Sequence, residues 1–355
     1  MCATAYEKLQ QASEYIIFGA QATAYGAYCA IKELFGKTPV CFLVTGADDN
    51  PESIEGIKVT GLSQAGAYRH CLVLIATPPQ YLTEITRQLT DKGFRAILIM
   101  DSYLEYRLMG DFYTRTEQML MLESVPVNKN VVPQIEIYMA KSNADCTLSH
   151  ERTHLKHIIS IHAGAALSSP IIADIADNTG DNISYKNRNY CELTATYWVW
   201  KNTSADYKGI CHYRRVFNYD DTLSGRLSSV DALLPLPFWC YPTAGTQYGR
   251  YVSVQDFSLM MEVIGKTSPG YLDQAQRFFG NKILYNYNMV VARQHVFDSY
   301  CDFLFGILTE VEARNVHIPR SDRYLGYLGE LLTSLYFCAN KDKFKIAHAQ
   351  KEWLI

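Results

Sequence analysis

The sequence lacks the cysteine patterns that bind metals. Its 10 cysteines are scattered, none forms a C-x-x-C pair, and no Cys/His spacing is typical of zinc. The N-terminus lacks the basic region and the following apolar stretch that a signal peptide would have. No apolar run approaches the ~20 residues that span a bilayer. We therefore expect a cytoplasmic protein with free thiols.

The sequence also lacks a strong charge of either sign. The formal net charge is -3, with 19% charged and 48% hydrophobic residues, which is a globular composition. Bulk electrostatics therefore predict no nucleic-acid partner, and any anion site must be a local cluster. Tyrosine is abundant instead, with 26 residues, and its apolar face and polar tip suit carbohydrate sites and interfaces as well as a core.

Short apolar segments alternate with helical segments in the first half of the chain. The expected strands are residues 15–18, 40–44, 57–59, 71–76 and 96–100, and the expected helices are residues 23–35 and 81–90. Such alternation favours a parallel sheet with right-handed crossovers. We predict an α/β protein with a Rossmann-like N-terminal domain over residues 1–125.

The glycine fingerprint of a dinucleotide site is mostly missing from this half. Aligned on Gly19, the next two glycine positions hold Gln21 and Ala24. This favours a degenerate domain used for scaffolding, assembly or regulation over a working nucleotide site. An NAD-dependent oxidoreductase has support only here.

A connection rich in Pro and Asn, residues 125–133, separates this half from a second α/β domain over residues 133–355. In the second half we expect one helix starting near Lys186 or Asn187. Its Tyr190, Tyr197 and Trp200 would lie on one face.

Cations and aromatic rings alternate over residues 181–217. The cations are Lys186, Arg188, Lys201, His212, Arg214 and Arg215, and the rings are Tyr190, Tyr197, Trp198, Trp200 and Tyr213. Cations fixed among rings suit a ligand with anionic groups and flat or apolar faces. A sugar nucleotide has both.

Five sequence motifs carry a resemblance to a known family over roughly residues 133–340. They are Asp181-Asn-Ile-Ser-x-Lys-Asn, Glu192-Leu-Thr-x-x-Tyr-Trp-x-Trp-Lys-Asn202, Gly209-x-x-His-Tyr-Arg-Arg215, Tyr287-Asn-Met289 and Arg323-x-x-Gly-x-x-x-Glu-x-Leu332. The chain resembles a bacterial family, catalogued as a domain of unknown function, that occurs with capsular and exopolysaccharide biosynthesis. The resemblance implies a glycosyltransferase of the GT-A fold type, and some members are associated with galactofuranose transfer.

The sequence departs from the GT-A pattern because it contains no Asp-x-Asp, the motif that holds Mg²⁺ or Mn²⁺ on the diphosphate. A metal cofactor is therefore not assigned. We expect the guanidinium groups of arginines to bind the diphosphate instead. Strand alternation would send His212 and Arg214 to one face and Tyr213 and Arg215 to the other, and we favour the first pair. A surface pair bridging to carboxylates is the alternative.

Further donor-site candidates are Lys186 and Lys201, and a solvated helix face is the alternative for Lys201. The first strand of a GT-A domain ends at the nucleotide, which adds Lys141 and Asn143. Candidates for lining the sugar or acceptor site are Tyr197, Trp198, Trp200 and Tyr213. Trp198 and Trp200 are two apart on a helix and cannot share a face, so at least one is expected in the core.

Two carboxylates are candidates for the base that accepts the proton of the acceptor hydroxyl. Asp256 lies in the first turn of an expected helix, where it serves equally well as a cap. Glu330 lies on an apolar helix and needs a partner, for which Arg323 is available two turns earlier. A structural ion pair explains Glu330 equally well.

The sequence thus predicts a glycosyltransferase that takes a sugar from a UDP donor, UDP-galactofuranose being one such donor. The acceptor would be a glycan or a lipid-linked oligosaccharide, with peripheral contact at the inner membrane face. A homo-oligomer is compatible with this interpretation. The alternatives are a non-catalytic sugar-nucleotide-binding or assembly protein and a glycoside hydrolase, which needs two facing carboxylates.

Overall fold

The computed structural model describes residues 4–46, 50–146, 148, 156–315 and 320–354. The chain divides into two compact units, and both combine helices with largely parallel sheets. Unit 1 comprises residues 1–119 and 238–242, and unit 2 comprises residues 120–237 and 243–355. No described helix is both long enough and apolar enough to cross a membrane.

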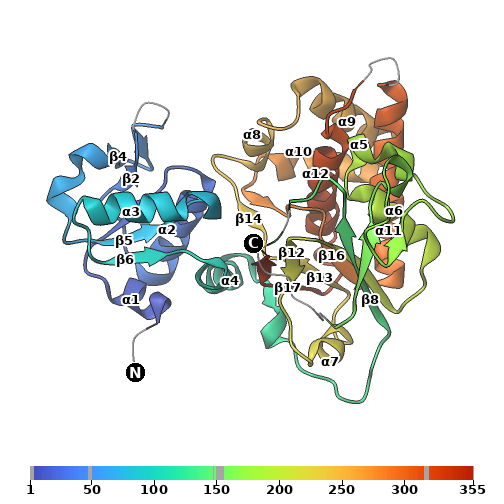
Figure 1. Ribbon diagram of the computed structural model, residues 1–355, viewed down its shortest axis with the longest axis horizontal. Coiled ribbons are helices and arrows are strands. Elements are labelled where there is room, and N and C mark those ends of the chain that lie inside the picture. The colour runs from blue at the N-terminus through green and yellow to red at the C-terminus, as the bar shows by residue number, and fades with distance from the viewer. Residues whose placement is uncertain (1–3, 47–49, 147, 149–155, 316–319, 355) are drawn as a thin grey trace. The chain divides into compact units, whose positions relative to one another are not determined.

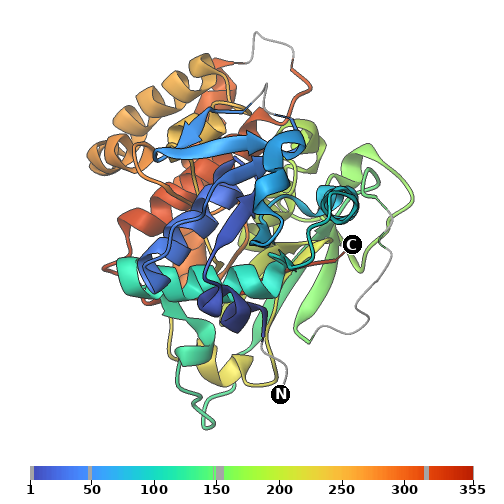
Figure 2. The same cartoon turned by 90° about the vertical axis from the view of Figure 1, so that its left-hand side faces the viewer.

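Unit 1 contains a six-stranded sheet in the order β3-β4-β2-β1-β5-β6 (Figures 1 and 2, blue to cyan). Its strands are β1 Tyr15–Phe18, β2 Phe42–Val44, β3 Ser53–Ile54, β4 Ile57–Gly61, β5 Leu72–Ile75 and β6 Ile97–Ile99. Its helices are α1 Ala5–Gln11, α2 Ala22–Phe35, α3 Leu82–Asp91 and α4 Ser102–Glu117. Every pairing is parallel except β3 with β4, so the alternation of strands and helices produced the expected parallel sheet.

Gly19 has a packing role that does not require a nucleotide. It lies directly after β1 with a φ of +128°, and a Cβ there would lie 2.8 Å from the carbonyl oxygen of Ala76. Only glycine fits so close to a neighbouring strand in this conformation. The surviving glycine of the fingerprint is therefore explained by the turn between β1 and α2.

A short segment from the second half of the sequence belongs to unit 1. It contains β14, Phe238–Trp239, and ends at Pro242. The Trp239 ring packs edge-on against Phe112 of α4, with centroids 5.1 Å apart, and Tyr241 lies 4.4 Å from Tyr25 of α2. Burial of these rings explains why the segment leaves unit 2, an excursion that the sequence analysis did not predict.

Unit 2 is built on a ten-stranded mixed sheet. The main path runs β10-β9-β8-β11-β16-β13-β17-β7, and β12 pairs with both β11 and β18. The strands are β7 Leu120–Met121, β8 Ile135–Lys141, β9 Ile158–His162, β10 Ile175–Ala176, β11 Tyr207–His212, β12 Arg215–Phe217, β13 Ala232–Pro235, β16 Val290–Arg293, β17 Ile346–Ala349 and β18 Lys351–Trp353. A short strand, β15 Ile283–Leu284, also lies in this unit.

The helices of unit 2 include a long, mostly apolar pair, α11 and α12, labelled in Figure 1. The helices are α5 Asn187–Tyr190, α6 Leu193–Asn202, α7 Leu223–Leu227, α8 Ala244–Tyr248, α9 Val254–Thr267, α10 Leu272–Phe279, α11 Gln294–Arg314 and α12 Tyr324–Ala339. Most residues of α12 are buried, among them its leucines. Burial on nearly all sides makes α12 a rigid central element that can hold a charged side chain in place.

The single helix expected from Lys186 onward is two helices, so that prediction was wrong. Cys191 has a φ of 53° and separates α5 from α6. The side-chain amide of Asn187 donates to the carbonyl oxygen of Cys191 over 2.8 Å and so binds a carbonyl freed by the break. The break leaves Glu192 at the start of α6 rather than in the middle of a longer helix.

A cationic cavity at the carboxyl edge of the unit 2 sheet

Three neighbouring parallel strands of unit 2 end at the same edge of the sheet. In the register of β8 with β11, Ala140 lies opposite His212, and in that of β8 with β9, Lys141 lies opposite His162. Ligands of α/β proteins commonly bind outside the carboxyl ends of such strands. The edge is therefore where a functional site is expected.

A tight hairpin follows β11 and sets the direction of the two arginines. β11 ends at His212, residues 213–214 form the turn, and β12 begins at Arg215, which pairs with His212. Residues directly opposite each other in an antiparallel pair share a face, so His212 belongs with Arg215. The expected alternation through Arg214 was wrong, because the strand ends before Tyr213.

A cavity of about 610 Å³ opens at this edge, and its charged lining is mainly cationic. Its basic residues are Lys141, Arg188, His212, Arg214, Arg215 and Arg323; its acidic residues are Asp145, Glu192 and Glu330; its tyrosines are Tyr213, Tyr287 and Tyr327. Among the described residues, none forms an ion pair with Lys141 or with the four arginines of this lining. The cavity therefore carries uncompensated positive charge.

Arg215 is held in an unusual way for a cation. Its side chain is 9% exposed, and its guanidinium lies 4.0 Å from the ring centre of Tyr287 and 4.1 Å from that of Trp353. Contact with two rings orients the planar group and stabilises its charge. Burial lowers the pKa of Arg215, although guanidinium remains protonated at ordinary pH.

The Nε atoms of Arg214 and Arg215 are buried and have no hydrogen-bond partner among the described residues. A buried cationic donor without a partner costs free energy, and native proteins generally satisfy such groups. Both arginines line the cavity, so an anion there would compensate their charge. The hairpin is therefore a candidate anion site.

Glu330 lies on α12 and lines the same cavity. The hydroxyl of Tyr248 donates a hydrogen bond to its Oε2 atom. Burial, and next the charge of Glu192, raise the pKa of Glu330 to about 8, although the charges of Arg215 and Lys351 act in the opposite direction. Its carboxyl group therefore exchanges a proton near neutral pH, as an acid–base group must.

Glu192 lines the same cavity beside His212. The side-chain amide of Asn288 donates to Glu192 Oε1 over 2.7 Å, and His212 Nε2 lies 3.7 Å from that oxygen. His212 Nε2 also lies 2.7 Å from the carbonyl oxygen of Tyr287, which can only accept, so Nε2 carries a proton. Burial lowers the pKa of His212, which favours the neutral imidazole.

Several of the sequence-predicted residues do meet at the cavity. They are Lys141, His212, Tyr213, Arg214, Arg215 and Glu330. Asn143 lies in the same loop, exposed, between the lining residues Ser142 and Ala144. These residues come from β8, the β11–β12 hairpin and α12.

Other predicted residues lie away from the cavity lining. Lys186 forms an ion pair with Glu312 over 2.6 Å, and the Lys201 ammonium lies 3.3 Å from the ring centre of Trp200. Asp256 is buried, accepts a hydrogen bond from the Ser253 hydroxyl at the start of α9, and pairs with Arg320 over 2.5 Å. All three have local roles that account for their positions.

The predicted aromatic residues of α6 also have structural partners. Trp198 is buried, and its indole N–H donates to Thr179 over 3.0 Å. Tyr197 and Trp200 pack on Phe305 of α11, with ring centres 5.1 and 5.7 Å away. Of the four aromatic candidates, Tyr213 lines the cavity.

The sequence analysis named Arg188 among the clustered cations without assigning it to the donor site, and it missed Glu192, Tyr248, Asn288 and Tyr327. Glu192 and Asn288 lie within the family motifs, and considering each residue of those motifs could have identified them. Tyr327 lies four residues after Arg323 and three before Glu330, on the same helix face. Tyr248 had no signal, because its contact with Glu330 joins distant segments.

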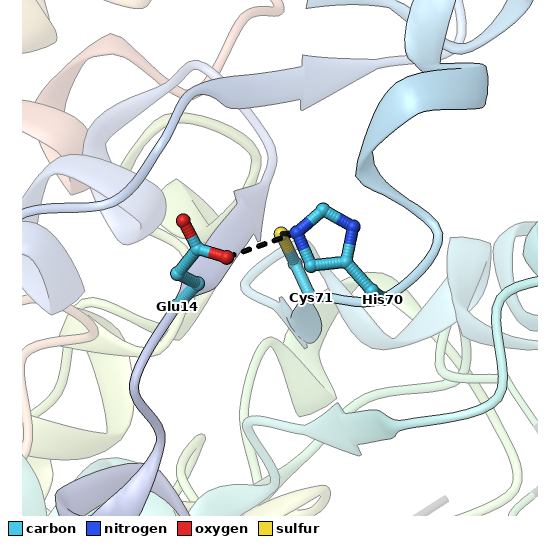
Figure 3. Close-up of side chains that lie close together, drawn as sticks. All are labelled: Glu14, His70 and Cys71. Atoms are coloured by element: carbon cyan, nitrogen blue, oxygen red, sulfur yellow. Dashed lines mark hydrogen bonds and ion pairs between the residues drawn. The ribbon is translucent and has the colours of Figure 1, made fainter.

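Among the described residues, the group whose atoms could surround a metal ion lies in unit 1 (Figure 3). Glu14, His70 and Cys71 offer ligand atoms within 4.8 Å of one another. His70 Nε2 and Glu14 Oε2 are 2.9 Å apart, and both side chains are more than half exposed, as in an ordinary surface ion pair. Burial raises the pKa of the Cys71 thiol, which disfavours the thiolate that a metal binds.

Comparison with known proteins finds a family match that lies almost entirely in unit 2. The family described as a domain of unknown function (DUF4422) matches residues 146–341, more than half of the chain. The chain belongs to this family. The matched range includes the β11–β12 hairpin, Glu192 and α12.

A solved structure described as the apo form of the bifunctional glycosyltransferase WbbM is similar to this chain. The identity is 28% and the TM-score 0.54, over 62% of this chain and 45% of that one. The chain thus matches less than half of the length of that protein. No curated protein matches the chain.

Proposed function

We propose that this chain is a glycosyltransferase that moves a sugar from a nucleoside diphosphate donor to a glycan. The observation that carries the proposal is the pair of buried, unpartnered guanidinium Nε atoms of Arg214 and Arg215 at the cavity. Arginine binds phosphate oxygens through two parallel hydrogen bonds and keeps its charge. The likeness to a glycosyltransferase supports the same conclusion.

In the proposed reaction, the acceptor hydroxyl oxygen forms a bond to the anomeric carbon of the donor sugar. The bond from that carbon to the phosphate oxygen breaks, and its electron pair stays on the nucleoside diphosphate. Arg214 and Arg215 stabilise the charge that develops there. The hydroxyl proton passes to the Glu330 carboxylate, which lines the cavity, whereas the other sequence-predicted base, Asp256, is engaged with Arg320.

The arginines supply positive charge that a divalent cation supplies in GT-A enzymes with an Asp-x-Asp motif. We therefore propose that Mg²⁺ or Mn²⁺ is not needed to hold the diphosphate. Activity in excess chelator, after removal of bound ions, would agree with this; full dependence on an added ion would contradict it.

The finer assignments rest on the family resemblance. Unit 1 would be a Rossmann-like domain without its own chemistry, and unit 2 a GT-A-like catalytic domain. The donor would be a UDP-sugar, with UDP-galactofuranose as a first candidate. The acceptor would be a capsular or exopolysaccharide chain. If this chain is attached to a lipid carrier, binding it would bring the protein to the inner face of the membrane.

A glycoside hydrolase is the second candidate, because Glu192 and Glu330 line one cavity and such enzymes use two carboxyl groups. Hydrolysis leaves the cluster of unpaired cations without a role, since neither substrate nor product needs to be anionic. Transfer from a nucleotide sugar uses both the cations and the acid, and it is therefore favoured.

The test is a panel of nucleotide sugars, incubated with the protein and with oligosaccharide acceptors, with release of the nucleoside diphosphate as readout. We expect release from at least one donor and saturable UDP binding in calorimetry. Neither release nor binding of any nucleotide would overturn the proposal. Cleavage of glycans without a nucleotide would favour the hydrolase.

A further inference from the structure

One face of α12 presents a cation, a ring and an acid to the cavity. Arg323 at the start of the helix, Tyr327 and Glu330 all line the cavity. Their spacings of four and three residues place them in one row along the helix. The row leads from the cation of Arg323 to the carboxyl group of Glu330, which is expected at the acceptor.

Two further tyrosines extend this row toward solvent. Tyr251 is 53% exposed, and its ring is stacked on that of Tyr327, with centroids 5.3 Å apart and planes 26° apart. Tyr248, which donates to Glu330, packs edge-on against Tyr251, with centroids 6.0 Å apart. The aromatic surface is therefore continuous from solvent to the acid.

Tyr251 and Tyr248 are held by the backbone at the end of α8. The Tyr251 amide donates to the carbonyl oxygen of Tyr248 over 2.8 Å, as does that of Val252 over 2.9 Å. Tyr248 is buried, which anchors the turn, whereas Tyr251 presents its ring outward. A ring fixed in this way loses little conformational freedom when it binds a ligand.

An exposed tyrosine is unremarkable alone, but this one is stacked on a residue that lines a charged cavity. Binding sites combine aromatic walls with a few placed polar groups, and a tyrosine offers both a flat apolar face and a hydroxyl. A saccharide ring has the matching surfaces, with an apolar C–H face and hydroxyl groups at its rim.

We propose that the exposed ring of Tyr251, which is stacked on Tyr327, forms a platform for the terminal sugar of the acceptor, with the reacting hydroxyl of that sugar directed to Glu330. The proposal rests on the proposed function, since it assigns the acceptor of the same reaction. Arg214 and Arg215 would bind the donor independently of the platform. Acceptor binding and donor binding can therefore be separated by mutation.

The test compares Tyr251→Ala with Tyr251→Phe, which keeps the ring, and with Val254→Ala. Val254 lies three residues after Tyr251 and is 77% exposed, so Val254→Ala removes apolar surface but no aromatic ring. With p-nitrophenyl hexosides as acceptors, we expect Tyr251→Ala to raise the acceptor KM about 3–10-fold, the effect of one ring contact. The KM for donor and the affinity for UDP should not change. Tyr251→Phe should keep most of the acceptor affinity because it keeps the ring, and Val254→Ala should behave as wild type.

Direct binding to an array of neutral oligosaccharides, read without any donor, keeps the test independent of turnover. Binding by wild type and Tyr251→Phe but not by Tyr251→Ala supports the platform even if no nucleotide sugar is used. An unchanged acceptor KM and unchanged array binding in Tyr251→Ala overturn it. An equal loss of UDP affinity also overturns it, because the ring would then act on the donor or on the fold.

Discussion

In both units parallel strands end together at one edge of a sheet, yet the residues at that edge differ in charge. In unit 1, β1, β2 and β5 are followed by Gly19-Ala20, Thr45-Gly46 and Ala76-Thr77, which carry no charge. In unit 2, Lys141 ends β8 and Arg214 and Arg215 follow β11. Similar strand arrangements thus carry a charged site in one unit and uncharged turns in the other.

One arginine from each unit extends this contrast. Arg87 of unit 1 is 62% exposed and bonds to both Glu84 and Asp91. Arg215 of unit 2 is buried between two rings and has no ion pair to a described residue. An exposed pair contributes little, whereas a buried cation without a partner persists only if something else compensates it. The contrast is a physical criterion for function that the fold alone does not provide.

The largest expected effect concerns the acid at the cavity. Glu330→Gln keeps the shape but cannot accept a proton, so we expect transfer to fall by about 10²–10⁴-fold. The wild-type rate should rise with pH up to about 8, the pKa of this group, as the carboxylate forms. The pH dependence of kcat/KM checks this, and a variant with the wild-type profile would contradict it.

Two controls sharpen that comparison. Glu84→Gln in unit 1 removes an exposed acid, and we expect no change in rate. Asp256→Asn breaks the ion pair with Arg320 and should lower the free energy of unfolding by about 1–3 kcal/mol while the folded protein still transfers sugar. If Asp256→Asn lost rate as Glu330→Gln does, the role of base would return to Asp256.

The next effect concerns the cation of the hairpin. Arg215→Ala should reduce turnover by about 10²–10³-fold, the range for removal of one donor to a developing negative charge. Arg215→Lys should restore little, because an ammonium lacks the planar face that contacts Tyr287 and Trp353 and the forked donors that bind a phosphate. Arg87→Ala is the matched control from unit 1, and UDP affinity by calorimetry is the second readout. Equal turnover in the Arg215 and Arg87 variants would abolish the distinction between the units.

The smallest effect is on stability. The folded-state pKa of Glu330, about 8, lies above its ordinary value of 4.5, so folding favours the protonated acid. Its stabilising contribution is complete below pH 4.5 and is lost as the pH rises through 8. The free energy of unfolding of wild type should therefore fall over this range relative to that of Glu330→Gln, in chemical denaturation. Parallel curves would mean that the acid is not buried.

The sequence predicted the parallel sheet of unit 1 because each apolar run and each helical period there is a local signal. It also named Lys141, His212, Arg214, Arg215 and Glu330, which line one cavity. The direction of the arginines was not predictable from alternation. A two-residue hairpin after His212 reverses the chain, and nothing in Tyr213-Arg214 is a typical turn signal.

The helix break at Cys191 was missed for a related reason. No Gly or Pro marks it, and the left-handed residue is stabilised by Asn187 and by close packing on Gly326 of a distant helix. The consequence was that Glu192 did not enter the predicted site. Contacts between segments far apart in sequence, such as Tyr248 with Glu330, leave no local pattern at all.

The pairing of β12 with β18 places residues from the far end of the chain beside the proposed anion site. Trp353 supplies one of the two rings beside Arg215, and Arg215 pairs with Trp353 in the register of these strands. Neither Lys351 nor Trp353 lines the cavity itself. Deleting these few residues, or unpairing them by an appended segment, should loosen the guanidinium and weaken phosphate recognition without altering any group that would touch the ligand.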